Sequence, residues 1–455
     1  MSTTRNRRLL LIESTLWSIY ANLTVAYITP FALLLGAGTA LIGLIQALPQ
    51  ATMMISQYPG TRLLQRLGRR KPIVLFFPLA SKLIWLPVAG LALLAGDSVK
   101  LNIFVALLAA SWFLVSLASP AWTSFMADVV PERIRGRFFA RRDLLITVVG
   151  TVVFWLAAAW LDLAPARGVG FASIFVLGLG LGLWGLWYRR KMREPVFSNH
   201  RAHFVDYFRG ASRPFNRFLR FTIAFYFAYS IAGPFFIVYI LRELGVSYTI
   251  MASAFVLGAA VRAVAGLHWG RVTDRFGDKP VTLLGTLGTA AVPFSYLFIT
   301  PGSAWLIFPV EIISAIVWAA FDRGHFNLLL DLTKPGERPL RVAEFNMLSS
   351  MPLIAAPIVG GFIAERGALL LTGIPLVFAI SVLFRLASAT LLLNIKEPRI
   401  RPEAPFRHVF REAFHVHPMR GVEHAIRVVL RRMRGPATAA ARGRGRVAAT
   451  TTQLY

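Results

Sequence analysis

The heptapeptide FDRGHFN, residues 321–327, places four ionisable or amide side chains in an otherwise apolar stretch: Asp322, Arg323, His325 and Asn327. Residues three apart on a helix share a face, so Asp322 and His325 could exchange a proton or a hydrogen bond. Arg323 points elsewhere, toward a partner or an anionic group of a substrate. Charged groups inside a bilayer are costly, so the heptapeptide predicts a substrate or proton-coupling site. The alternative is a structural ion pair with other helices.

The depth of this cluster follows from Asp331, which is expected to mark the end of the same helix. At 1.5 Å per residue, Asp322 then lies about 13 Å inside, near the middle of a bilayer. Lys82, in another apolar stretch, could pair with Asp322, bind a substrate carboxylate, or snorkel to the surface. Three uncharged residues, Asn22, Gln46 and Gln50, either line a cavity or form interhelical hydrogen bonds.

Four further charged residues fall inside apolar stretches. Arg262 and Glu311 are expected to be structural. Glu13 and Arg385 lie near predicted helix ends, where contact with lipid headgroups is the simpler account.

The composition indicates what positions these side chains. Of 455 residues, 56% are hydrophobic and only 15% are charged, whereas soluble domains have about a quarter of charged residues. Apolar runs of about 20 residues recur throughout, and each can cross a bilayer as a helix. The sequence therefore predicts an all-α polytopic membrane protein. Its start, MSTTRNRRLLLIE, runs into an apolar span too long for a signal peptide.

About twelve membrane spans are predicted. They cover residues 9–35, 39–58, 72–94, 101–126, 144–163 and 170–187, then 221–241, 250–269, 281–299, 304–330, 347–364 and 370–393. Strongly basic connections alternate with nearly uncharged ones, and the net charge is +28. By the positive-inside rule the basic connections and both termini are cytoplasmic, in a multi-pass protein of the cell membrane.

An internal repeat divides the chain. ADVVPERIRGR (127–137) and LDLTKPGERPLR (330–341) follow equivalent spans, and their aspartates, Asp128 and Asp331, are 203 positions apart. Pro195 and Pro398 end similar motifs at the same offset. Matches in register predict two parallel halves. The expected domains are 1–188 and 221–398, two six-helix bundles, with a cytoplasmic linker (189–220) and a basic cytoplasmic tail (399–455).

A third repeated feature is a basic segment between the second and third spans of each half. GRVTDRFGDKP (270–280) and GTRLLQRLGRRKP (60–72) resemble the loop motif of the major facilitator superfamily, although the first copy has Gln65 where the motif has Asp. The resemblance covers roughly residues 10–398. It implies two bundles around a central cavity that rock to alternate access.

The resemblance also implies a cytoplasmic gate, in which Asp274 meets the start of the fifth span. Gly270 and Gly277 would allow a tight bend and close helix approach. The candidate gate residues are Gly270, Asp274, Arg275, Gly277, Lys279, Arg137 and Arg141. The alternative is that these charges only set topology.

The expected function is secondary transport of a small solute, coupled to protons, by a monomer without a cofactor or metal. No P-loop, HExxH or GxSxG motif is present, and we expect no enzymatic activity. The alternative is a non-transporting receptor or assembly factor. Anionic lipids are the expected partners of the basic loops and tail, rather than nucleic acid.

Overall fold

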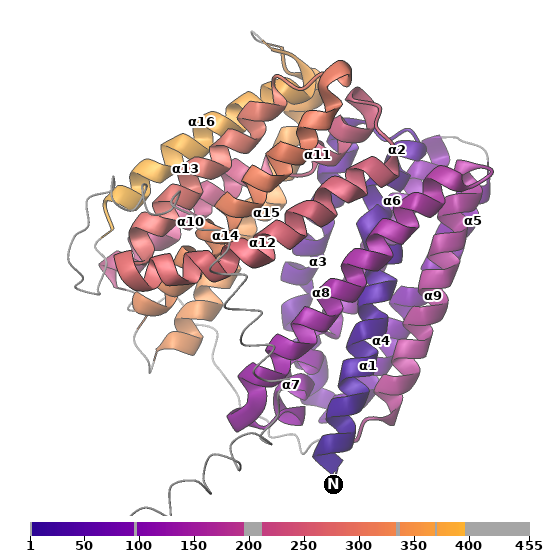
Figure 1. The fold of residues 1–455 in the computed structure, drawn as a ribbon. Helices are drawn as coiled ribbons and strands as arrows, with labels where there is room; N and C mark the ends of the chain where they lie inside the picture. Colours follow the sequence, from indigo (N-terminus) through magenta and orange to yellow (C-terminus); the bar gives the residue numbers. More distant parts are fainter. Residues whose placement is uncertain (1, 95–97, 195–211, 334–336, 369–370, 396–455) are drawn as a thin grey trace, which may run out of the picture.

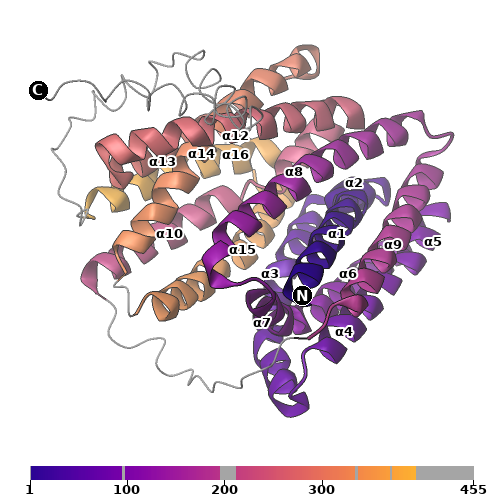
Figure 2. The same ribbon diagram turned by 60° about the horizontal axis from the view of Figure 1, so that its bottom comes forward.

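The computed structural model describes residues 2–94, 98–194, 212–333, 337–368 and 371–395. The predicted tail and the central part of the linker lie outside these residues. The chain forms two helical bundles side by side, with α1 to α9 in one and α10 to α16 in the other (Figures 1 and 2). Both bundles are helical throughout, as the apolar runs predict.

The first bundle contains α1 (Ser2–Leu23), η1 (Val25–Tyr27), α2 (Ile28–Leu34), α3 (Thr39–Leu67), α4 (Lys71–Leu83), α5 (Trp85–Leu93), α6 (Ser98–Leu117), α7 (Ser119–Val129), α8 (Glu132–Leu163) and α9 (Arg167–Lys191). The second contains α10 (Arg213–Ser230), α11 (Phe235–Val238), the π-helical turn η3 (Tyr239–Glu243), α12 (Tyr248–Phe276), α13 (Asp278–Tyr296), η4 (Pro301–Leu306), α14 (Ile307–Asp331), α15 (Arg338–Arg366) and α16 (Gly373–Leu393).

Eleven of the described helices, with kinked segments joined, are long and apolar enough to cross a membrane. The helix α13 occupies the predicted ninth span but contains several threonines and glycines. Buried Thr282 and Thr286 satisfy their hydroxyls by donating to carbonyls one turn back, at 2.7 and 2.8 Å. A Cβ on Gly285 would lie 2.5 Å from the backbone nitrogen of Phe321, so α13 packs tightly on α14.

Two ends of the molecule are distinguished below by their charge. The basic end carries the Arg- and Lys-rich segments at residues 66–71, 133–142, 189–191 and 271–279. The opposite end carries the turns at residues 35–38, 164–166, 244–247 and 299–301.

The hydrophobic core shows that the bundles meet at the opposite end. The largest cluster of buried apolar residues joins both bundles and includes Phe31 and Phe171 from the first, with Phe235 and Phe378 from the second. Toward the basic end the core divides into separate clusters, such as that around Phe125 in the first bundle and that around Phe218 in the second. In Figure 1, α8 and α12 approach each other at one end and diverge toward the other.

The repeated basic segments are mostly helical, which corrects the prediction that they are turns. Residues 60–67 continue α3, and residues 270–276 continue α12. The chain turns only at Gly68 and Gly277, which have φ values of 60° and 96° and end these helices. A Cβ on Gly270 would meet no atom within 4 Å, so Gly270 neither bends the chain nor allows close approach.

Candidate functional site

The Asp322 side chain forms an ion pair with Arg262, which lies on the neighbouring helix α12. Both side chains are about half exposed, at 50% and 48%. The Arg262 guanidinium carbon also lies 5.9 Å from the ring centroid of Trp318, one turn before Asp322 on α14. Because this pair is accessible and lies beside an indole, its carboxylate can exchange the guanidinium for a proton, and its guanidinium can exchange the carboxylate for a charged solute.

Aromatic rings continue from this pair toward α10. Tyr229 meets Trp318 edge to face at 5.2 Å between centroids, and Tyr226 meets Tyr229 in the same way at 5.5 Å. These rings, with the Arg262–Asp322 pair, form what we call the α12–α14 site. From the sequence, aromatic residues in the spans could either line a pocket or pack in the core, and Arg262 was expected to be structural.

His325 does not pair with Asp322, contrary to the prediction. Its Nε2 is 3.0 Å from the Thr222 hydroxyl, and its ring lies among Phe218, Phe321 and Phe345. The side chain is 6% exposed. The offset of three residues turns His325 into the bundle interior while Asp322 faces α12. The structure therefore places His325 in the aromatic core of the second bundle.

The other members of the heptapeptide also diverge. Arg323 is exposed beside Gly266 of α12. The Asn327 amide donates to the buried carboxylate of Asp278, at 3.0 Å, and so ties α14 to the start of α13 near the basic end. The structure thus brings Asp322 and Arg323 against α12 but does not gather all four polar residues into one site.

Lys82 lies in the other bundle and does not meet Asp322. Its Nζ is 3.4 Å from the centroid of the Tyr20 ring, and the residue is 6% exposed, so the lysine does not snorkel. Glu13 and Arg385 are also buried, which corrects their assignment to lipid headgroups. Glu13 pairs with Arg189, and Arg385 donates to the Thr289 carbonyl at 2.6 Å.

The uncharged candidates are bonded or packed within the first bundle. Gln46 donates to the Thr29 hydroxyl at 2.7 Å, joining α3 to α2. Asn22 donates to the Ser18 carbonyl one turn back on α1, at 2.9 Å. Gln50 is partly buried one turn beyond Gln46 on α3.

The predicted gate residues occupy the basic end, where the helices diverge. Asp274 and Arg275 are exposed on the last turn of α12, and Arg137 and Arg141 are exposed on α8. Lys279 donates to the Leu393 carbonyl of α16, at 2.9 Å. Contact between Asp274 and α8 belongs to a state closed at this end, and it stays a prediction.

At the opposite end, two carboxylates cross between the bundles. Asp162, on α8, accepts hydrogen bonds from the backbone nitrogens of Tyr248 and Thr249 at 3.1 and 2.7 Å, at the start of α12. Glu365, on α15, accepts from the backbone nitrogen of Ala40 at 2.9 Å, at the start of α3. Each carboxylate thus satisfies unpaired donors at a helix N-terminus of the other bundle. We call them the reciprocal carboxylate caps.

The two caps are equivalent in the repeat. Asp162 and Glu365 are 203 positions apart, the same offset that relates Asp128 to Asp331. Extending the repeat beyond the basic motifs would have found them. Backbone packing beside the caps is close: a Cβ on Gly43 would lie 2.1 Å from the Pro357 carbonyl oxygen, and one on Gly361 would lie 2.7 Å from that of Thr39.

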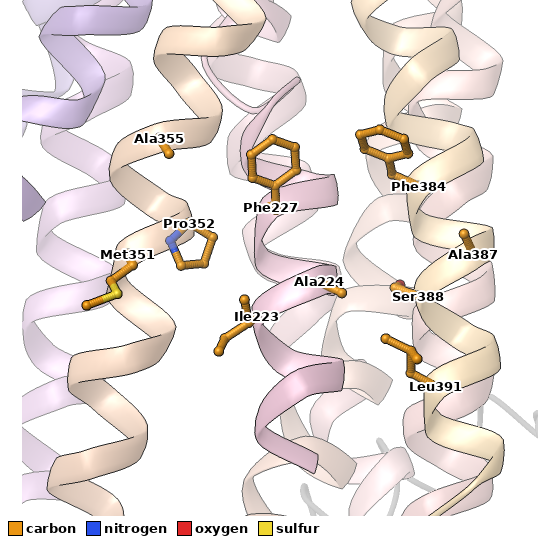
Figure 3. A pocket seen from close by; sticks show the side chains of 10 residues that line it. All are labelled: Ile223, Ala224, Phe227, Met351, Pro352, Ala355, Phe384, Ala387, Ser388 and Leu391. Atoms are coloured by element: carbon orange, nitrogen blue, oxygen red, sulfur yellow. The ribbon is translucent and has the colours of Figure 1, made fainter. Parts of the chain in front are cut away.

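A separate apolar groove of about 580 Å³ lies within the second bundle, between α10, α15 and α16. Figure 3 shows Phe227 and Phe384 near one end of the groove and Ile223 and Leu391 near the other. Among the described residues that line the groove, Ser388 is the one with a polar side chain. This lining suits a hydrocarbon chain rather than a charged solute.

These features define a multi-pass α-helical membrane protein of two bundles that are joined at one end and separate at the other. The sequence profile of the Major Facilitator Superfamily matches residues 9–221 and, in a second match, residues 219–434. The chain belongs to this superfamily, as the loop motif indicated.

Named relatives are described as transporters but match only parts of the chain. A putative proline/betaine transporter of Staphylococcus aureus is 28% identical over 261 residues, or 52% of this chain and 53% of the relative. A probable peptide/nitrate transporter of Arabidopsis thaliana is 30% identical over 132 residues, which span 27% of this chain and 24% of the relative. The matched region is therefore about half of the first relative's length and a quarter of the second's.

Solved structures share the fold. A crystal structure of the nucleoside transporter NupG has a TM-score of 0.65 and 13% identity, covering 87% of this chain and all of that one. A bacterial homologue of the iron transporter ferroportin, in an inward-facing state, has a TM-score of 0.62 and 17% identity, covering 86% and 99%. At these identities the likeness concerns the fold alone.

Proposed function

We propose that this chain is a secondary transporter that moves a small solute across the cell membrane by alternating access. The observation that carries the proposal is the asymmetry of the bundle interface. The shared core and the reciprocal carboxylate caps join the bundles at the opposite end, while their cores separate at the basic end. Rocking about the contacts would close one end as it opens the other.

By the positive-inside rule, the basic end is cytoplasmic, and the described conformation is then inward-facing. The superfamily membership and the transporter relatives support this proposal.

The α12–α14 site is the proposed place of solute and proton binding. Protonation of Asp322 would remove the negative charge that holds Arg262, and Arg262 could then bind an anionic group of the solute. Deprotonation would restore the ion pair and expel that group. The adjacent rings of Trp318 and Tyr229 would pack against the rest of the solute. A carboxylate-bearing solute such as proline or betaine, named for the Staphylococcus relatives, fits this chemistry.

The test is uptake or efflux by the purified protein in proteoliposomes, with proline, betaine and nucleosides as probes, with and without an imposed pH gradient. The proposal expects gradient-driven movement of at least one carboxylate-bearing solute, lost in Asp322→Asn and in Arg262→Gln. The exposed acid Asp143, paired with its neighbour Arg142, gives the matched control Asp143→Asn. Binding without movement in any gradient would instead indicate the receptor alternative.

The apolar groove and the cations of the basic end also favour binding of an anionic lipid, with its acyl chain in the groove and its headgroup near the cations. Arg217 at the start of α10 donates to the Asn394 carbonyl at the end of α16, at 3.1 Å, which places a cation near the groove. Transport rates in vesicles with and without phosphatidylglycerol, at fixed pH gradient, test whether such lipid is required.

A further inference from the structure

A polar pocket of about 300 Å³ lies at the opposite end, at the seam between the bundles. The first bundle contributes the turn after α2 and Arg167, the first residue of α9. The second contributes Arg242 and Tyr248. Residues of both bundles therefore line one partly open space, in which Arg167 and Arg242 are both exposed, and a ligand bound there would bridge the bundles.

The pocket is formed partly by a rare backbone conformation. Residues Tyr239–Glu243 form a π-helical turn, in which the Leu244 nitrogen donates to the Tyr239 carbonyl at 2.9 Å. Such turns re-aim side chains and are frequent at functional sites. Here the turn carries Arg242, which lines the pocket together with Arg167.

The acids near these arginines are engaged elsewhere or lie outside the pocket. Asp162 uses both carboxylate oxygens on the backbone of α12, and Glu365 accepts from Ala40. Glu243, the neighbour of Arg242, is exposed and does not line the pocket. In the part of the chain that the structure describes, no carboxylate lies within ion-pair distance of Arg167 or Arg242. Two exposed arginines thus line one pocket without an ion-pair partner among the described residues, and their like charges disfavour closing the seam between the bundles.

We propose that this pocket binds a small oxyanion between Arg167 and Arg242. Guanidinium groups bind carboxylate and phosphate oxygens in pairs, and an anion held by both would replace repulsion with a bridge between the bundles. The bound anion stabilises the state closed at this end and so acts on the proposed rocking motion, on which its regulatory role rests. The site is distinct from the α12–α14 site.

Direct binding tests the site without reference to transport. Inorganic phosphate is the probe, and calorimetry on the purified protein, without solute and with ionic strength held constant by chloride, measures its binding. One phosphate per chain is expected for wild type. Arg167→Gln and Arg242→Gln should each weaken binding at least tenfold. Arg366→Gln changes an exposed arginine at the same end that does not line the pocket, and it should bind as wild type does. No saturable binding, or equal binding by all variants, overturns the proposal.

Distance measurements test the consequence. The natural chain has no cysteine, so Leu93→Cys and Gly302→Cys, both exposed, allow one spin label on each bundle at the opposite end. Phosphate should raise the closed-to-open ratio several-fold in wild type and not in Arg167→Gln. Without phosphate we expect the opposite order. Arg167→Gln removes the repulsion between the two arginines, so its closed-to-open ratio should be higher than that of the wild-type protein.

A purely structural role for Arg167 would not produce this reversal. Phosphate binding without a change in distance would overturn the bridging role. A single unchanging distance at both ends under all conditions would count against the alternating-access proposal itself, while calorimetry would still decide whether the anion site exists.

Discussion

The reciprocal carboxylate caps allow a quantitative prediction about the conformational equilibrium. A carboxylate at a helix N-terminus contributes about 0.3–1 kcal/mol when exposed and up to about 2 kcal/mol when partly buried. Asp162 and Glu365 are both exposed at the surface, so about 1 kcal/mol each is the appropriate value. The caps share no partner, so their contributions should add. Removing both should cost the closed state about 2 kcal/mol, or about a 30-fold change in the equilibrium.

The substitutions can grade the loss of charge and of hydrogen bonds. Asp162→Asn keeps an amide oxygen that can accept from Thr249 but loses the charge and the acceptor for Tyr248, whereas Asp162→Ala loses the charge and both acceptors. The effect of Asp162→Ala should therefore be the larger. The Glu365 cap should be the more sensitive to Ala, because Gly38 at the N-terminus of α3 has no side chain to replace it. At the start of α12, Ser247 accepts only from Ile250, at 3.2 Å, and cannot replace Asp162 on the preceding donors.

The assay is the distance distribution between labels at each end. The pair Leu93 and Gly302 reports the opposite end. The pair Gly136 and Gly270 reports the basic end, where a Cβ at either glycine meets no atom within 4 Å. The double Ala variant should lengthen the first distance and shorten the second. Glu243→Gln removes an exposed acid at the same end and serves as the control. An unchanged distribution in the double variant would refute the assignment of the caps as a conformational lock.

Other predictions concern the interface, the core and the gate. Gly43→Ala should shift the protein toward the state open at the opposite end because its methyl group would meet the Pro357 carbonyl, whereas Gly90→Ala, in open space, should not; the same label pairs decide this. His325→Ala should lower the free energy of unfolding by about 2–4 kcal/mol because it leaves a cavity in the aromatic core. The double variant His325→Phe with Thr222→Val should recover much of the lost stability and should still transport in a pH-dependent way. If a stable double variant loses proton coupling, His325 takes part in proton transfer after all. Asp274→Asn should raise the population open at the basic end more than Gln65→Ala does. Equal effects of the two substitutions would indicate that the charges of the basic segments only set membrane topology.

Span number, helical class and the two-bundle repeat could be predicted from the sequence because a bilayer imposes local constraints. Each helix must satisfy its own backbone hydrogen bonds and present about 20 apolar residues, and both conditions are visible in a single stretch of chain. The superfamily could be identified for a similar reason, since its loop motif lies within eleven consecutive residues. The repeat offset of 203 residues could also be determined from the sequence, and applying it to Asp162 leads to Glu365.

Partner choice was decided only by tertiary structure. Asp322 and His325 lie one turn apart on α14, yet the first meets Arg262 and the second meets Thr222, because neighbouring helices approach α14 from different sides. The sequence placed Glu13 and Arg385 near lipid headgroups and allowed Lys82 to pair with Asp322, bind a substrate carboxylate or snorkel, but packing buries all three. The conformation itself, joined at one end and open at the other, depends on contacts between residues as distant as Ala40 and Glu365. No local pattern contains that information, since it arises from how two separately folded bundles meet.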